Sequence, residues 1–320
     1  MNQLFDPKKF VTEQTAWMKK ELAGEAVIAT SGGVDSTVAA VLAHNALGKK
    51  LHCVFVDTGY MRKGEGAHTK AMFKGIGIDV EVIDASAKFY EALKGVTDPE
   101  TKRKIIGEMF IRVFEESAKA TKATYLVQGT IAPDWIESGS GIRDNIKSHH
   151  NVGGLPEKHG FKLVEPLRDL YKDEVRKVGK ELGIPEEVYN RQPFPGPGLA
   201  IRILGEPTPE RAKILQEAVY IAEDELEKAA KAGECVIPWQ YFAVLLPTKT
   251  VGVLGDKRAY GYTIGVRAVQ SIDGMTARYS EVPHAVLGRI SNRITRELKD
   301  HVNRVVYDIT SKPPGTIEWE

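Results

Sequence analysis

Cysteine is scarce in this sequence of 320 residues, which contains only Cys53 and Cys235. They lie far apart, each among apolar residues, so neither a disulfide framework nor a zinc site of the CxxC kind can be built, and we expect two buried thiols. Long apolar runs are missing as well, since no stretch approaches the roughly 18 residues that a membrane span needs. Residues 1–22 mix charged with apolar residues at helical spacing, unlike a signal peptide. We therefore expect a cytoplasmic protein with no membrane partner.

The sequence also lacks an excess of charge of one sign. It has 44 lysines and arginines against 43 aspartates and glutamates, which leaves a formal charge of +1. This balance does not call for a polyanion, so we expect no nucleic-acid partner, although a local basic face could exist within a neutral total. The 42% hydrophobic content is ordinary for a globular protein, and the length predicts about two domains.

Short apolar runs alternate with segments of helical period in the first half of the chain. This alternation predicts a doubly wound α/β domain, in which a parallel sheet of about five strands is covered on both faces by right-handed crossovers. The expected strands are 25–30, 51–59, 78–86, 123–130 and 161–167, and the expected helices are 36–47, 66–75, 99–121 and 171–182.

The composition changes at residues 190–210, which carry five prolines and three glycines in 21 residues. Proline removes a backbone donor and glycine loosens the chain, so neither a helix nor a central strand should run through this segment. We place the domain boundary here and expect a first domain over residues 1–194 and a second over 195–320. The second reads as a smaller α+β unit, with helices near 210–232 and 283–301 and extended segments between and after them.

The first expected strand runs into the turn SGGVDST, residues 31–37. Glycines let the backbone approach a ligand closely, and the free N–H groups at the start of a helix form an anion site. The turn is not a Walker loop, because no lysine precedes the hydroxyl residue, and it does not fit GxGxxG. SGGxDS instead matches the loop of enzymes that cleave ATP between its α and β phosphates. Asp35 would then bind a bridging Mg²⁺, whereas the simpler alternative is a capped glycine turn.

Further polar residues follow the other strands. The backbone at Val56 is placed to offer N–H and C=O groups to an adenine, although a purely structural strand is also compatible with its sequence. Asp134 is a second candidate metal ligand, and a turn or capping role fits it equally well.

Residues 146–156, IKSHHNVGGLP, join a lysine and two histidines to a flexible Gly-Gly. The pattern is that of a lid which closes over phosphates. Lys147 is the best candidate for stabilising charge on the α-phosphate, the alternative being an ordinary surface lysine. His149 and His150 are weak evidence for a metal, because no further ligand stands at a suitable spacing.

The last residues, DITSKPPGTIEWE, are unusual for a frayed end because they combine Pro-Pro with apolar and acidic residues. Lys312 could pair with a ligand phosphate, and Ile317 with Glu318 could contact a base. A strand that closes the second domain is the alternative.

Six of these segments together resemble the ATP-pyrophosphatase part of GMP synthetase, over nearly the whole chain. They are SGGVDST, KRKIIGEMF, IKSHHNVGGLP, RQPFPGPGLAIR, GVLGDKRAYGY and SKPPGTIEWE. The loop alone is shared by the wider superfamily of adenine nucleotide alpha hydrolase-like folds, while the 146–156 segment and the terminal segment are more specific.

The resemblance implies that ATP adenylylates the 2-oxygen of XMP and that ammonia then displaces AMP to give GMP. It implies that residues 31–37, which we call the phosphate loop, hold the pyrophosphate end of ATP, with Mg²⁺ on Asp35. It also implies that Lys147, His149 and His150 form the lid. XMP would lie at Lys312, Ile317 and Glu318, with Asp256 a weaker candidate. The residues assigned to ATP are Ser31, Gly32, Gly33, Val34, Asp35, Ser36, Thr37 and Val56.

The family often carries an amino-terminal glutamine amidotransferase of about 200 residues, and here the phosphate loop begins at Ser31. Ammonia is therefore expected from solution or from a separate glutaminase subunit, and a homodimer through the second domain is implied. Other enzymes with this loop include NAD synthetase, argininosuccinate synthetase and tRNA-modifying ligases. The balanced charge and the isolated cysteines argue against the tRNA enzymes. A nucleotide-binding sensor without catalysis remains the alternative of a different class.

Overall fold

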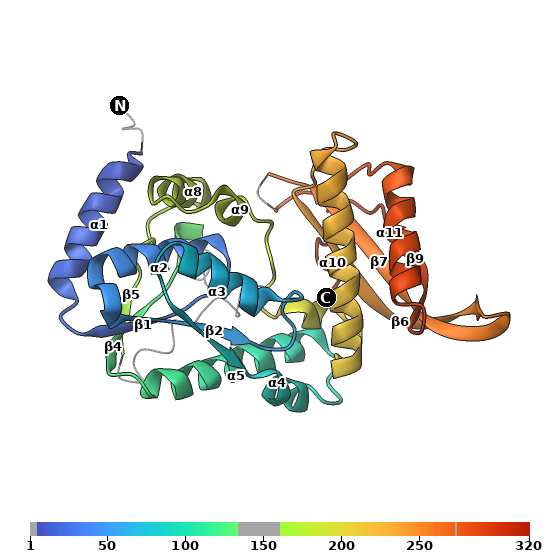
Figure 1. Cartoon of the computed structure of the whole chain (residues 1–320), viewed down its shortest axis with the longest axis horizontal. Helices are drawn as coiled ribbons and strands as arrows, with labels where there is room; N and C mark the ends of the chain where they lie inside the picture. The colour runs from blue at the N-terminus through green and yellow to red at the C-terminus, as the bar shows by residue number, and fades with distance from the viewer. Residues whose placement is uncertain (1–4, 134–160, 273) are drawn as a thin grey trace. The chain divides into compact units, whose positions relative to one another are not determined.

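The computed structural model describes residues 5–133, 161–272 and 274–320. Its contacts divide the chain into two compact units (Figure 1). Unit 1 contains residues 1–57, 64–85 and 107–191, and unit 2 contains residues 58–63, 86–106 and 192–320. Among the described residues, no helix is long and apolar enough to cross a membrane.

Unit 1 is built on a parallel sheet of five strands, in the order β3-β2-β1-β4-β5. The central strands are apolar and buried on both faces, as covered parallel strands are. This sheet confirms the expected doubly wound fold. Its strands are β1 (Glu25–Ala29), β2 (Leu51–Asp57), β3 (Val80–Asp84), β4 (Ala123–Val127) and β5 (Lys162–Val164).

Helices cover both faces of this sheet. Right-handed crossovers put the helices after β1 and β2 on one face and the helix before β4 on the other, and Figure 1 shows α2 and α3 opposite α5. The core helix α2 is rich in Ala, Val and Leu, and α1 and α8 pack against it. The helices are α1 (Pro7–Glu21), α2 (Val34–Leu47), α3 (Glu65–Gly75), α5 (Pro99–Lys119), α8 (Lys172–Glu181) and α9 (Glu186–Tyr189), with the 3₁₀ turn η1 (Gly48–Lys50).

The strand order reverses between β1 and β4, so the chain leaves these two neighbours toward opposite faces of the sheet. Open α/β sheets bind their ligands at the carboxyl edge beside such a reversal. The loop after β1 is residues 30–33, and the loop after β4 begins at Gln128. The candidate phosphate loop therefore lies where this fold class places its ligands.

Unit 2 is a mixed sheet with two long helices on it. β6 (Gln240–Leu254) and β7 (Lys257–Gln270) form a long hairpin, β8 (Arg278–Tyr279) pairs with β7 in antiparallel fashion, and β9 (Val302–Asp308) pairs with β7 in parallel. α10 (Pro209–Lys231) packs on β6, and α11 (His284–Glu297) packs on β9 and α10. The α+β expectation for this half is confirmed.

Two segments from the first half of the chain also belong to unit 2, namely residues 58–63 and 86–106, which include α4 (Ser86–Ala92). Tyr60 is fully buried, its hydroxyl donates to the Pro207 carbonyl, and its own carbonyl accepts from Leu199 N–H at 2.7 Å. At Gly198 a Cβ atom would lie only 2.3 Å from that Tyr60 carbonyl oxygen. The expected domain boundary between residues 194 and 195 stays a prediction. The two compact units differ from it, because unit 2 also includes residues 58–63 and 86–106.

The segment rich in proline and glycine is not an exposed linker. Before α10 begins at Pro209, it contains only the short 3₁₀ helix η3 (Gly198–Arg202), all of whose residues are buried, which agrees with the expectation that no helix or central strand runs through it. Of the two thiols, Cys53 is buried in β2 as expected, whereas Cys235 is only half-buried. The expectation that Cys235 is buried is therefore wrong, because it follows α10 in a turn with few covering side chains.

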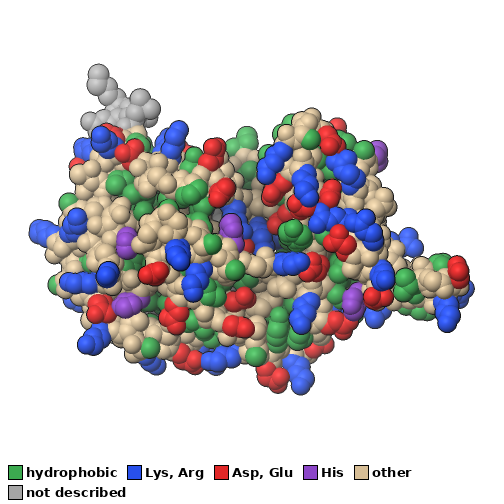
Figure 2. Space-filling model, viewed as in Figure 1, with side chains coloured by type: hydrophobic (Ala, Val, Ile, Leu, Met, Phe, Trp, Pro, Cys, Tyr) green, Lys and Arg blue, Asp and Glu red, His purple; other side chains and the backbone are tan. Residues whose placement is uncertain are grey.

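Charged side chains of both signs are mixed on the face shown in Figure 2, where no broad patch of one sign appears. This mixture agrees with the formal charge of +1 over the sequence.

Candidate functional site

The turn after β1 has the geometry of an anion site. Gly32 has a positive φ of 72°, and Gly33 is the N-cap of α2. Because glycine has no side chain, the first-turn N–H groups of α2 lack the acceptor that a serine or aspartate cap would provide. Those N–H groups and the positive end of the helix dipole are the donors that a phosphate oxygen requires.

Hydroxyl groups surround the same turn. The Ser31 and Ser36 hydroxyl oxygens are 3.0 Å apart, and the Ser31 hydroxyl accepts from Gly33 N–H at 3.3 Å. Thr37 instead donates to the Gly33 carbonyl at 2.8 Å and is fully buried. The Ser36 hydroxyl also donates to the Gly33 carbonyl, at a longer 3.2 Å. An anion would therefore take the Ser36 proton from that longer bond, whereas Thr37 fixes the shape of the turn.

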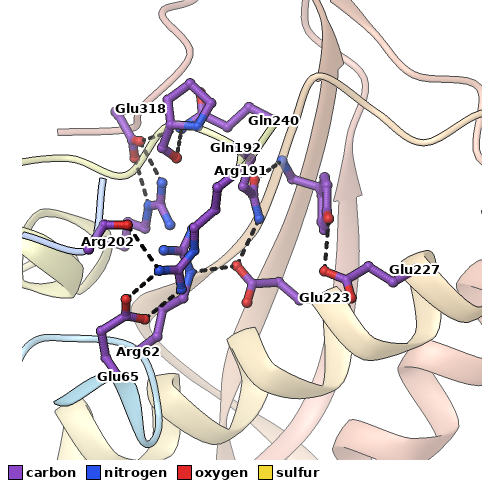
Figure 3. A network of polar contacts seen from close by, with 12 residues as sticks. Arg62, Glu65, Arg191, Gln192, Arg202, Glu223, Glu227, Gln240 and Glu318 are labelled. Atoms are coloured by element: carbon purple, nitrogen blue, oxygen red, sulfur yellow. Dashed lines mark hydrogen bonds and ion pairs between the residues drawn. The ribbon is translucent and has the colours of Figure 1, made fainter. Parts of the chain in front are cut away.

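An ion pair between the buried Glu65 and the partly buried Arg191 supports the turn. Glu65, at the start of α3, is 4% exposed and receives two hydrogen bonds from the Arg191 guanidinium, one of 2.7 Å from Nη2 (Figure 3). Arg191 also donates to the Gly32 carbonyl at 3.4 Å. A Cβ atom on Gly32 would come within 2.8 Å of the Glu65 carboxylate, so the turn requires glycine for space as well as for its φ.

Asp35 lies in the first turn of α2 and has two different oxygens. Oδ2 forms an ion pair with the Lys172 ammonium at the start of α8, whereas Oδ1 is buried and has no hydrogen-bond partner among the described residues. An unpartnered carboxylate oxygen beside a phosphate site is suited to a hard cation, so Mg²⁺ fits here. The described residues contain no cluster of three or more metal-ligating side chains. Such sparse protein ligation is usual for Mg²⁺, which takes most of its ligands from phosphates and water.

The loop after β4 presses on the same helix turn. A Cβ atom on Gly129 would lie 2.8 Å from the Asp35 carbonyl carbon and 2.9 Å from Ser36 N. Since atoms of real side chains do not approach so closely, only glycine lets the two loops meet at the strand-order reversal.

Val56 offers its main chain rather than its side chain, which is only 3% exposed. The Val54 carbonyl accepts from Thr30 N–H at 2.8 Å, so the main-chain groups of Val54 face β1. Main-chain groups of residues two apart on a parallel strand point the same way, and β1 ends at Ala29. The N–H and C=O of Val56 therefore project beyond the end of β1.

The chain terminus is held in unit 2 by three buried cations. Arg202 is 1% exposed and makes two bonds to the Glu318 carboxylate, at 2.9 and 2.7 Å, and Gln240 adds a third at 3.1 Å (Figure 3). Lys102 is fully buried and pairs with Glu320, and burial lowers the pKa of Lys102. The expectation that the terminus is held in place is correct.

Arg267 is the third cation and is fully buried in β7. It donates to the carbonyls of Thr316 and Ile317, both at 2.9 Å, and to the Asp308 carboxylate at 2.7 Å. Every nitrogen of this guanidinium is used, so the segment before Glu318 has one fixed course.

The residues predicted to bind XMP do not all lie close to one another within one chain. The Lys312 ammonium donates to the Gly274 carbonyl at 2.8 Å, and Lys312 bridges Ala277 beside the β8 end of the sheet. Asp256 lies in the hairpin turn at the other end of β7, with a φ of 60°. Strand β8 pairs with β7 at Val269, and the 13 residues from 256 to 269 span roughly 40 Å of strand.

Relatives of the chain decide its family. A protein of Thermococcus kodakarensis, named as one subunit of a glutamine-hydrolyzing GMP synthase, is 59% identical over 98% of this chain and 99% of its own length. The chain belongs to this family of GMP synthase subunits. Its members are ligase subunits of GMP biosynthesis with an ATP-pyrophosphatase domain, so the chain is an enzyme subunit.

Other comparisons agree with this GMP synthase membership. The GMP synthase subunit of the same name from Methanopyrus kandleri is 57% identical over 99% of this chain and all of its own. The glutamine-hydrolyzing GMP synthase of Thermotoga petrophila is 58% identical over 97% of this chain but only 62% of its own. Residues 225–319 match the GMP synthase C terminal domain family, and residues 8–133 match NAD synthase. A solved NMN synthetase from Francisella tularensis covers 61% of this chain and 78% of its own at 19% identity and a TM-score of 0.48, too low to carry an argument.

Some predicted site residues of this chain lie outside the part that the structure describes, and some residues that support the site were not predicted. Lys147, His149, His150 and Asp134 lie outside the described residues. Lys172, Glu65 and Arg191 were not predicted, because their partners are distant in sequence. Arg202 and Arg267 carried a usable signal, since each is a single charged residue inside an apolar run, GLAIRIL and TIGVRAV.

Proposed function

We propose that the chain aminates XMP to GMP at the expense of ATP. The XMP 2-oxygen attacks the α-phosphorus of ATP, forms adenylyl-XMP and releases pyrophosphate. Ammonia then adds at C2, and the bond from C2 to that oxygen breaks, so the oxygen leaves within AMP. The observation that carries the proposal is the phosphate loop with Asp35 in its first helical turn, in a chain of the GMP synthase family.

The phosphate loop would hold the pyrophosphate end of ATP, with first-turn N–H groups and the Ser31 and Ser36 hydroxyls as donors. This reaction needs donors aimed at the leaving pyrophosphate more than it needs a protein nucleophile. Val56 would bind the adenine through its projecting main chain, which the end of β1 at Ala29 supports. Lys147, His149 and His150 would cover the phosphates.

Mg²⁺ would be held by Asp35, whose unpartnered Oδ1 supports this role. When bound, Mg²⁺ would neutralise part of the phosphate charge. The Asp35 carboxylate would fix where that charge is neutralised, and in the structure the ammonium of Lys172 pairs with this carboxylate.

XMP would be bound by Lys312, Ile317 and Glu318, with Asp256 as a further contact. The roughly 40 Å of strand between Asp256 and the tail supports a site to which a second copy contributes its hairpin. A homodimer through the C-terminal domain is therefore part of the proposal. The Glu318 carboxylate is already bound by Arg202, so its main chain is the better candidate for contact with the base.

Ammonia would come from a separate glutamine amidotransferase subunit. Relatives that match the chain end to end are named as one subunit of a glutamine-hydrolyzing enzyme, which supports this arrangement. The cytoplasmic location stays a prediction.

The test follows the 2-oxygen. The purified chain is given ATP, Mg²⁺, a high concentration of ammonium and XMP labelled with ¹⁸O at position 2. We expect GMP, pyrophosphate and AMP that carries the label in its phosphate. IMP, which lacks the 2-oxygen, is the matched control and should give no AMP, and glutamine in place of ammonium should give no GMP. AMP formed without XMP, or AMP without the label, would refute the proposed route.

A further inference from the structure

Lys172 begins helix α8, and its ammonium contacts the Asp35 carboxylate from 137 residues away in sequence. The helix that carries it is firmly placed. Tyr171 N–H donates to the Glu174 carboxylate at 2.9 Å, and Val175 and Val178 are fully buried. A Cβ atom on Gly179 would come within 3.3 Å of the Val38 side chain of α2, so α8 lies directly on α2. The base of Lys172 is therefore fixed beside the phosphate loop.

The ammonium itself is less constrained than its base. The Lys172 side chain is 46% exposed and that of Asp35 is 26% exposed. A partly exposed ion pair contributes only about 0–1 kcal/mol, so it is easily exchanged for another partner. The flexible lysine side chain can turn without any movement of the helix.

Two cations would compete for the same carboxylate. Asp35 Oδ2 is taken by Lys172, while Oδ1 stays buried without a partner among the described residues. A divalent cation on this carboxylate would neutralise the charge that now holds the ammonium. Lys172 would then be a free cation next to bound phosphates.

We infer that Lys172 is a phosphate ligand which Asp35 holds in place until Mg²⁺ occupies that carboxylate. The ammonium then pairs with oxygens of the pyrophosphate group, where negative charge builds up as the bond to the α-phosphorus breaks. The same lysine thus keeps Asp35 neutralised in the empty site and stabilises the leaving group in the filled one. The inference rests on the proposed function, because it takes the bound group to be the pyrophosphate end of ATP.

The test measures binding of inorganic pyrophosphate by calorimetry, so it does not depend on turnover. Lys172→Met removes the charge and keeps the length of the side chain. Lys177→Met is the matched control, since Lys177 lies on the same helix, pairs with Asp173 at 3.3 Å and is 55% exposed. With Mg²⁺ present we expect Lys172→Met to weaken binding about 10- to 100-fold, the effect of one charge-assisted hydrogen bond. Lys177→Met should stay within about twofold of the wild type, as a surface charge does.

A second arm uses EDTA to remove divalent cations and separates release of Lys172 from simple charge balance. Asp35→Asn should strengthen pyrophosphate binding, because it frees the ammonium. In the Lys172→Met background the same change should give a clearly smaller gain. Equal gains in both backgrounds would mean that Lys172 only balances charge, and the inference would be wrong.

The outcomes also separate this inference from the proposed reaction. Pyrophosphate binding that responds as expected, in a chain that forms no AMP from XMP, would preserve the role of Lys172 and refute the reaction. Labelled AMP formed together with unchanged binding in Lys172→Met would do the reverse. Lys172→Arg keeps the charge and should retain most of the binding, which would exclude a folding defect as the cause of the loss.

Discussion

The contact between Gly129 and the first turn of α2 makes a sharp prediction for Gly129→Ala. The new Cβ atom would lie 2.8 Å from the Asp35 carbonyl carbon, about 0.6 Å closer than the 3.4 Å at which ordinary contact begins. The opposing atoms are backbone, so no side chain can turn away. Either the β4 loop or the start of α2 must therefore move by about that distance.

The size of the effect follows from where this movement occurs. Overpacking in a well-packed region costs about 1–3 kcal/mol of stability. The anion donors of the phosphate loop belong to the helix turn that is pushed, and misplacing reacting groups by roughly 1 Å can reduce a rate about 100-fold. We expect kcat/KM for ATP to fall about 10- to 100-fold, with a smaller change in KM for XMP, whose proposed ligands lie in unit 2.

Steady-state kinetics with varied ATP and then varied XMP measures this difference, and thermal unfolding measures the stability. Gly107→Ala is the matched control, because Gly107 lies inside α5 and nothing comes within 4 Å of its added Cβ atom. That variant should gain up to about 1 kcal/mol from the removal of a helix glycine. If Gly129→Ala binds ATP as tightly as Gly107→Ala, the loop after β4 does not shape the phosphate site.

Two further predictions concern ion pairs. Arg267→Gln removes a fully buried charge that binds the Asp308 carboxylate and the carbonyls of Thr316 and Ile317. We expect the free energy of unfolding to fall by about 3–5 kcal/mol and KM to rise more for XMP than for ATP. Equal rises in the two KM values would mean that the C-terminal residues do not bind XMP. The hydrogen bond from His52 at 2.7 Å lowers the pKa of Glu25 below its usual 4.5, so this bond stabilises the fold above that value and is lost as the pH falls through the lowered pKa. The melting temperature of Glu25→Gln should therefore lie below that of the wild type at pH 7 and approach it as the pH falls through the lowered pKa of Glu25, and a gap that does not narrow on acidification would contradict this account.

The phosphate loop was predictable because its chemistry is local. Residues 31–37 are contiguous, and glycine, aspartate and serine at those positions specify both the turn and its donors. The five strands and their order of appearance followed in the same way, from runs of branched apolar residues between helical segments. Element type depends on neighbours in sequence, which one chain displays fully.

The supporting residues were not predictable, because their partners are set by the fold. Lys172 meets Asp35 across 137 residues, and Arg202 meets Glu318 across 116. Asp256 is the opposite case. The sequence resemblance assigns it to the same site as Lys312, although the length of β7 separates the two residues within one chain. Composition and periodicity say that a residue is in a strand or a helix, but not which distant side chain it meets.

Unit 2 is assembled from segments far apart in the chain, which affects how the chain folds during synthesis. Tyr60 and Phe89 are fully buried in a unit whose main part starts only at Gln192. Roughly 130 residues separate the first of these segments from that part, which takes about ten seconds to translate. During that interval two aromatic side chains lack their final neighbours, so the nascent chain exposes apolar surface that a chaperone can bind. For the same reason, a fragment that begins at residue 195 would lack the Tyr60 and Lys102 contacts and should not fold alone.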